Sequence, residues 1–180
     1  FLIYIKLHRL ASINITPLDG IKSMIPDANI TYSQGTTILE TELPTMPDNL
    51  FYISDGSPGV KAEYFKGFNI EREPDLVRIE KTPNISLELE GTPDSTIFKT
   101  NSFSVRFSGN IVVQKSGSYK INVNGIDGLK FYFRGKKLID KVSDNYSHTT
   151  FKTSYLDKGT QYPFSIEYFE DEGWGEVRLG

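Results

Sequence analysis

The sequence predicts a mainly β protein: an antiparallel β-sandwich or barrel from about residue 59 onward, preceded by a short α/β fragment. Two observations predict the β part, namely a period-two alternation of apolar and polar residues and an aromatic content of 13%. A third, a helix start near the N-terminus, predicts the α/β fragment. A chain of 180 residues can also bury roughly 70% of the surface that it exposes when unfolded.

The clearest strands lie between Phe103 and Asp140. Apolar residues there alternate with polar ones in three runs, which begin at Phe103, Tyr119 and Leu129. This alternation is typical of strands with one solvated face. A glycine-containing break at 116–118 precedes the second run, and another at 135–136 follows the third. Glycine can adopt the positive φ that tight hairpin turns need. We therefore expect a run of antiparallel β-hairpins.

The N-terminal part is built differently. Thr16 and Pro17 match a helix N-cap and first turn, and Pro26 marks the end of that helix. Apolar residues share one face of it: Leu18, Ile21, Met24 and Ile25. Residues 28–32 read as a strand. Helix followed by strand is an α/β unit, so residues 1–35 are predicted to be a fragment of an α/β domain.

Residues 36–58 are predicted to be a linker, because prolines recur there without any sustained periodicity. Residues 59–180 form the predicted β domain. Its strands outside the central stretch are expected at 60–65, 85–89, 151–155, 162–169 and 174–179.

Composition and charge narrow the classes of function. A net charge of −3 gives no electrostatic reason to expect nucleic acid or an anionic membrane as a partner. There is no cysteine, which excludes disulfides and thiolate metal sites. The two histidines stand without ligand spacing, so no metal and no cofactor is expected. The apolar start of the chain is too short for a membrane span, and we interpret the chain as a piece of a longer protein whose localisation stays open.

Several motifs of the β part resemble a known family. FSVRFSG, SGSY and DGLKFYFRGKKLID, in that order, resemble the β-barrel domain first described in anthrax protective antigen, the PA fourteen domain. Residues 60–65 resemble its opening strand, and 162–169 with 174–179 resemble its closing strands. The resemblance implies a carbohydrate-recognition or spacer module of the kind inserted in glycosidases, adhesins and toxins.

The N-terminal part has its own resemblance. TPLDGIKSMIPDANITYSQGT is similar to a segment of the second, α/β domain of glycoside hydrolase family three, the β-glucosidase and β-xylosidase family. In some of these enzymes a PA fourteen-like barrel follows such a segment. The resemblance implies that the catalytic Asp and Glu lie elsewhere in a parent enzyme, so no catalytic residue is expected in this chain.

Four residues are candidates for carbohydrate binding. Trp174, the one tryptophan, and Tyr146 lie in polar loops where an aromatic ring could stack on a sugar. Asp127 and Arg134 flank the same hairpin that the ligand loops of the resembled family flank. A purely structural role is the alternative for these candidates. Trp174 would then pack on the closing strand, and Asp127 would form a turn. Some adhesins of the family bind Ca²⁺ through two consecutive Asp at this position, but this chain has Ile126-Asp127, so a calcium site is not expected.

These observations predict an accessory carbohydrate-binding or substrate-specificity domain of a β-glucosidase-like enzyme. Its partners would be a β-linked oligosaccharide or glycoside and the remaining catalytic domains of the parent. The alternatives are a free-standing carbohydrate-binding or adhesion module and a spacer without a ligand. The helix and strand near the N-terminus favour the first of these.

Overall fold

The computed structural model describes residues 17–31, 43–87, 91–141, 148–171 and 173–180. The chain divides into two units, residues 1–39 and 40–180. Within the described residues, no helix is long and apolar enough to cross a membrane.

The first unit contains helix α1 (Pro17–Met24), as the N-terminal pattern predicts. Its apolar residues are largely exposed, with Met24 at 83% and Ile25 at 50%. The predicted strand at 28–32 does not form in its described part, since residues 28–31 have no regular structure. A strand needs neighbours that supply its hydrogen bonds, and the described residues pair none with it.

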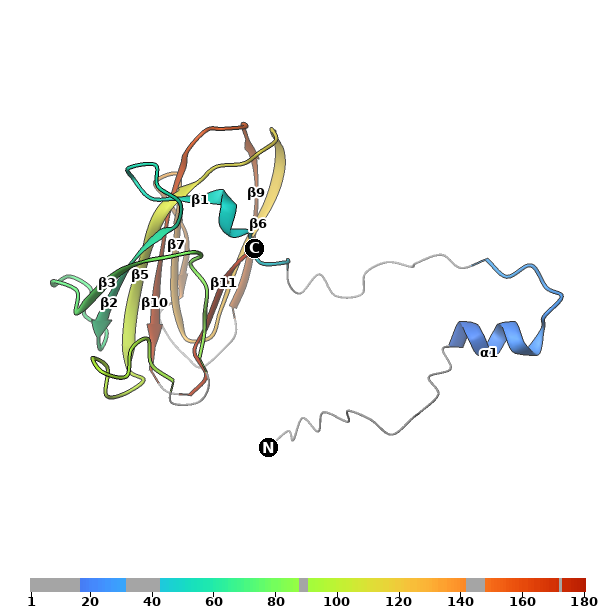
Figure 1. Cartoon of the computed structure of the whole chain (residues 1–180), viewed down its shortest axis with the longest axis horizontal. Helices are drawn as coiled ribbons and strands as arrows, with labels where there is room; N and C mark the ends of the chain where they lie inside the picture. Colours follow the sequence, from blue (N-terminus) through green and yellow to red (C-terminus); the bar gives the residue numbers. More distant parts are fainter. Residues whose placement is uncertain (1–16, 32–42, 88–90, 142–147, 172) are drawn as a thin grey trace. The chain divides into compact units, whose positions relative to one another are not determined.

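The second unit is an antiparallel β-sandwich, as predicted (Figure 1). The larger sheet has seven strands, in the order β3-β2-β5-β10-β7-β8, with β1 paired to β5. These strands are β1 (Phe51–Tyr52), β2 (Val60–Lys66), β3 (Leu76–Glu80), β5 (Phe103–Ile111), β7 (Gly128–Phe133), β8 (Lys136–Lys141) and β10 (Tyr162–Glu170). The smaller sheet has four, in the order β4-β11-β6-β9: β4 (Ile85–Ser86), β6 (Gly117–Gly125), β9 (His148–Leu156) and β11 (Glu176–Leu179).

The predicted strands are present, but their pairing differs from a run of hairpins. β5 pairs with β2 and β10, whereas β6, the next strand in the chain, belongs to the other sheet. Only β7 and β8 form a hairpin within the predicted run, across a turn in which Arg134 and Gly135 both have positive φ. Alternation shows which face of a strand is buried but does not identify its neighbour, and a sandwich lets the chain cross between sheets.

Aromatic rings fill the space between the sheets, as the composition suggests. Tyr64 on β2 contacts Phe98, Phe103 and Phe107, with ring centroids 6.3 to 6.5 Å apart. Such pairs each contribute about 0.5–1.5 kcal/mol beyond the area that they bury. The described core residues fall within 51–179, so the second unit contains a complete core of its own.

Part of the predicted linker belongs to this sandwich. A 3₁₀ turn, η1 (Asp48–Leu50), leads into β1, and Phe51 is fully buried against Phe164. The backbone N–H of Val112 donates to the carbonyl of Leu50, 2.9 Å away, and ties this segment to the end of β5. Prolines mark irregular backbone, and here that backbone packs on the sheet.

Candidate functional site

The structure brings two of the four candidate residues to one end of the sandwich. Asp127 lies in the connection between β6 and β7, and Trp174 lies in the connection between β10 and β11. The N–H of Ile126 donates to the carbonyl of Glu176 at 2.9 Å, which holds the two connections together. Asp127 adopts a φ of 72°, a left-handed conformation that Asp tolerates better than most residues.

Beneath this surface lies a pair of buried carboxyl groups. The side chains of Asp127 and Glu170 are 5% and 1% exposed. The Tyr168 hydroxyl donates to Glu170 Oε2 and accepts the backbone N–H of Glu176 at 3.1 Å. Gly175 packs directly against Glu170, because a Cβ there would lie 2.8 Å from Oε2. The pair is therefore enclosed by the same segment that carries Trp174.

Burial and the negative charge of Asp171 affect the pKa of both carboxyl groups. Burial raises the pKa of Glu170, and the charges of Asp127 and Asp171 raise it further. Burial likewise raises the pKa of Asp127, against the opposing effect of the Asp171 backbone N–H. Asp127 Oδ2 and Glu170 Oε1 have no donor among the described residues. The hydrogen bond between the two side chains raises the pKa of Glu170 and lowers that of Asp127, so Glu170 is the member of the pair that more strongly favours its protonated form.

Above the pair, Trp174 is solvent-facing. It is 61% exposed, so its ring is not packed over the closing strand as the structural alternative expects. Gly173, with a φ of 104°, and the buried Gly175 flank it. Asp171, on the same connection, is exposed as well. This connection therefore presents an exposed aromatic ring, which can stack on a pyranose, and an exposed carboxylate, which can accept hydrogen bonds from hydroxyl groups.

Arg134 does not join this site. It follows β7, whereas Asp127 precedes it, so the six-residue strand separates them by about 20 Å. Its guanidinium lies 5.3 Å from the centroid of the Tyr162 ring, and its backbone N–H donates to the Pro163 carbonyl at 2.8 Å. Arg134 thus packs at the opposite end of the sandwich. Tyr146 lies outside the described residues.

No described group of three or more His, Cys, Asp or Glu side chains is arranged to hold a metal ion. Asp127 is preceded by the half-buried Ile126, and the described backbone contains no cis peptide bond.

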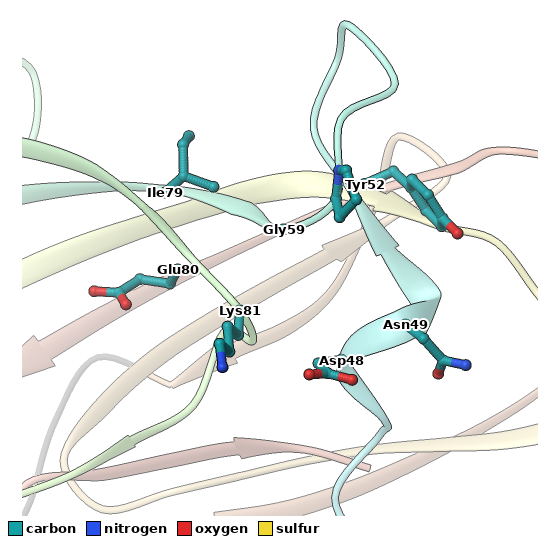
Figure 2. A pocket seen from close by; sticks show the side chains of 8 residues that line it. Asp48, Asn49, Tyr52, Gly59, Ile79, Glu80 and Lys81 are labelled. Carbon is teal, nitrogen blue, oxygen red and sulfur yellow. The ribbon is translucent and has the colours of Figure 1, made fainter.

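The opposite end contains a cavity that the sequence did not indicate. It has a volume of about 500 Å³ and lies between β3, η1 and the turn before β2. Figure 2 shows Ile79, Glu80 and Lys81 along one wall and Asp48, Asn49 and Tyr52 along the other, with Gly59 between them. Most of its residues come from the predicted linker, from Gly59 directly after it, and from β3, a strand that the alternation did not reveal. The prolines and Asp, Asn and Gly residues of the linker range indicate turns there, but they do not indicate a cavity.

A family model decides the relationship. The model of the PA14 domain matches residues 56–180, more than half of the chain. The chain belongs to the PA14 domain family. This confirms the resemblance of the β part, and the fold is that of the PA14 domain.

Among curated proteins, the anti-sigma-I factor RsgI3 of Acetivibrio thermocellus is 31% identical over 113 residues, which cover 62% of this chain and 17% of that protein. A solved anti-sigma factor domain-containing protein from Clostridium clariflavum is 29% identical, with a TM-score of 0.60, over 67% of this chain and 40% of that one. The β-glucosidase of Kluyveromyces marxianus, solved in complex with glucose, shares the fold at 19% identity and a TM-score of 0.59, over 92% of this chain and 21% of that one. The chain thus spans less than half the length of each.

Proposed function

We propose that the PA14 domain of this chain binds carbohydrate through the surface around Trp174. The observation that carries the proposal is the 61% exposure of this ring, next to Gly175, whose backbone packs on Glu170. A ligand that covers the ring removes apolar surface from water, which favours binding. The apolar face of a β-linked pyranose is such a ligand, and Asp171 supplies an acceptor for its hydroxyl groups.

The buried pair supports this site from below. Its contacts with Gly175 and, through Tyr168, with Glu176 hold the backbone that directly follows Trp174, which limits the positions that the ring can take before a ligand binds. Preorganisation of this kind improves affinity because less conformational entropy is lost on binding.

For the parent protein, we propose a β-glucosidase-like glycoside hydrolase in which this domain limits substrate size at the mouth of the active site. The fold shared with the β-glucosidase extends over 92% of the chain, beyond the range that the PA14 model matches. The observed helix α1 is consistent with a preceding piece of α/β domain. In this arrangement the catalytic carboxylates come from the rest of the enzyme.

Calorimetric titration with β-linked gluco- and xylo-oligosaccharides, with and without Ca²⁺, tests the binding site. We expect binding that does not depend on Ca²⁺ and that Trp174→Ala weakens at least tenfold, or about 1.4 kcal/mol. Tyr155→Ala is a matched control, because Tyr155 on β9 is exposed to a similar degree, 59%. No heat with any sugar, or an equal loss in both variants, would refute the site.

A second parent is favoured by a separate observation. Both relatives above 25% identity reported above carry names of anti-sigma factors, at 31% and 29%. In such a protein a sugar-binding domain would make the response depend on the presence of the carbohydrate. It would then have to bind on its own, without a catalytic domain to complete the site. Binding by the isolated chain at micromolar sugar concentration favours this parent, and binding only within a larger enzyme favours the first.

A further inference from the structure

The cavity at the far end of the sandwich from Trp174 is built on rigid elements. β1 pairs with the end of β5, and the N–H of Gly59 donates to the Phe51 carbonyl at 2.9 Å. Gly59 has a φ of 118°, and a Cβ there would lie 2.7 Å from Ile79 and 2.8 Å from the Glu80 carbonyl. Only glycine, which has no Cβ, allows the backbone at this position to approach β3 so closely. The walls are set by strand pairing and not by loop packing.

Its polar side chains are available to a ligand. Within the described part of the chain, Asp48, Asn49 and Lys81 make no side-chain hydrogen bond or ion pair, with one another or with other residues. Glu80 differs, since its Oε1 accepts from the Tyr64 hydroxyl at 3.0 Å and from Arg78. The Glu80 carboxylate is thus engaged by Tyr64 and Arg78, and Figure 2 shows it directed away from Asp48 and Asn49.

The chemistry of the lining selects the class of ligand. The Asp48 carboxylate and the Lys81 ammonium group carry opposite charges, and the Glu80 carboxylate is paired with Arg78, so the lining has no net charge that would favour an anion or a cation. Tyr52 and Ile79 add apolar surface. A volume of about 500 Å³ lies within the usual range for small-molecule sites. Donors and acceptors around a partly apolar hollow suit a neutral ligand rich in hydroxyl groups.

The cavity does not extend past Glu80 along one face of the strand. A smaller cavity of about 230 Å³ has Arg78, Asn84 and Ser86 in its lining. Glu80 contributes to both linings, but Ile79 lines only the first cavity and Arg78 only the second, and neighbouring residues of a strand point to opposite faces. The two cavities are therefore separate, and a ligand of the first need not reach the second.

We propose that the cavity beside β3 is a second carbohydrate site that takes a neutral sugar. The inference rests on the proposed function, and it adds a site that is remote from Trp174. Strand β5 separates the two sites: Phe103 pairs with Glu170 at one end, and Ile111 pairs with Phe51 at the other. Its nine residues span about 27 Å. One domain would then hold two sugars at opposite ends.

Amide NMR titration of the full chain with a β-linked glucose disaccharide separates the two sites. We expect two independent groups of shifted signals, one at Gly173, Trp174 and Gly175 and one at Asn49, Gly59 and Lys81. The double variant Asn49→Ala with Lys81→Ala should lose the second group, with at least tenfold weaker binding there, and keep the first. Lys136→Ala, an exposed lysine at the start of β8, is the control that should change neither.

Each outcome decides one of the two ideas. Shifts confined to the Trp174 surface would overturn the second site and leave the proposed function standing. Shifts confined to β3 would support the second site and refute the role of Trp174. No shift anywhere would refute both. The unshifted signals of the variants show whether they are folded, so a loss of binding cannot be confused with unfolding.

Discussion

At the scale of single residues, the Asp127–Glu170 pair links the candidate site to stability. For both carboxyl groups burial is the largest influence, and it raises the pKa above the value of the unfolded chain. The folded protein therefore binds more protons than the unfolded one between the two pKa values. Because of this, the pair's contribution to the free energy of unfolding is fully present below the unfolded pKa and falls as pH rises through the folded pKa.

Glu170→Gln tests this coupling. The amide retains an acceptor for the Tyr168 hydroxyl and supplies a permanent donor to Asp127, so the variant has no ionisable group at position 170. We expect its free energy of unfolding to fall less than that of the wild type as pH rises above about 4, the ordinary carboxyl pKa of an unfolded chain. Urea denaturation at several pH values measures the difference. Glu73→Gln, at an exposed loop position, should follow the wild type. A wild type that gains stability relative to Glu170→Gln as pH rises would contradict the expectation.

At the scale of elements, the β7–β8 hairpin shows how a turn fixes a strand pair. Arg134 and Gly135 have φ values of 54° and 74°, the pair of positive angles that a type I′ turn requires. Side chains other than those of Gly, Asn and Asp pay about 1–2 kcal/mol in this region. The structure tolerates Arg134 there, and its guanidinium lies over the Tyr162 ring.

Gly135→Ala is therefore expected to lower the free energy of unfolding by about 1–2 kcal/mol. Gly135→Asn should cost clearly less, because Asn tolerates the left-handed conformation. Nothing lies within 4 Å of a Cβ at this position, so a steric clash does not complicate the comparison. Thermal unfolding of both variants measures the costs, and equal losses would show that the turn conformation is not their cause.

Elements also show what the sequence could and could not predict. Strands with one clearly buried face, such as β5 and β10, follow from period-two alternation. β3 was missed because it is an edge strand whose Val77 and Ile79 are about half exposed, so its pattern carries little contrast. Pairing was missed for another reason: the partners of β6 are β9 and β11, far from it along the chain. The positions of the candidate site residues relative to one another could not be predicted for the same reasons. Asp127 and Arg134 are seven positions apart in sequence, yet a strand puts them at opposite ends.

At the scale of the whole molecule, the second unit contains all of the described core residues. Their rings and aliphatic side chains come from both sheets and from the connection at 97–98, with none from residues 17–31. A chain that begins at residue 40 therefore retains the complete described core. Folding of such a domain on its own follows from this, because burial of apolar surface is the main favourable term.

We expect the chain of residues 40–180 to melt within about 2 °C of the full chain, a difference below about 1 kcal/mol for a domain of this size. It should also bind β-linked oligosaccharides with unchanged affinity, since both proposed sites lie within 48–175. Differential scanning calorimetry and the calorimetric titration described above measure the two properties. Unchanged melting with lost binding would mean that the N-terminal unit contributes to the sugar site. A fall of more than about 5 °C would mean that the sandwich depends on residues before 40 for its stability, and the domain would then have to be defined to include them.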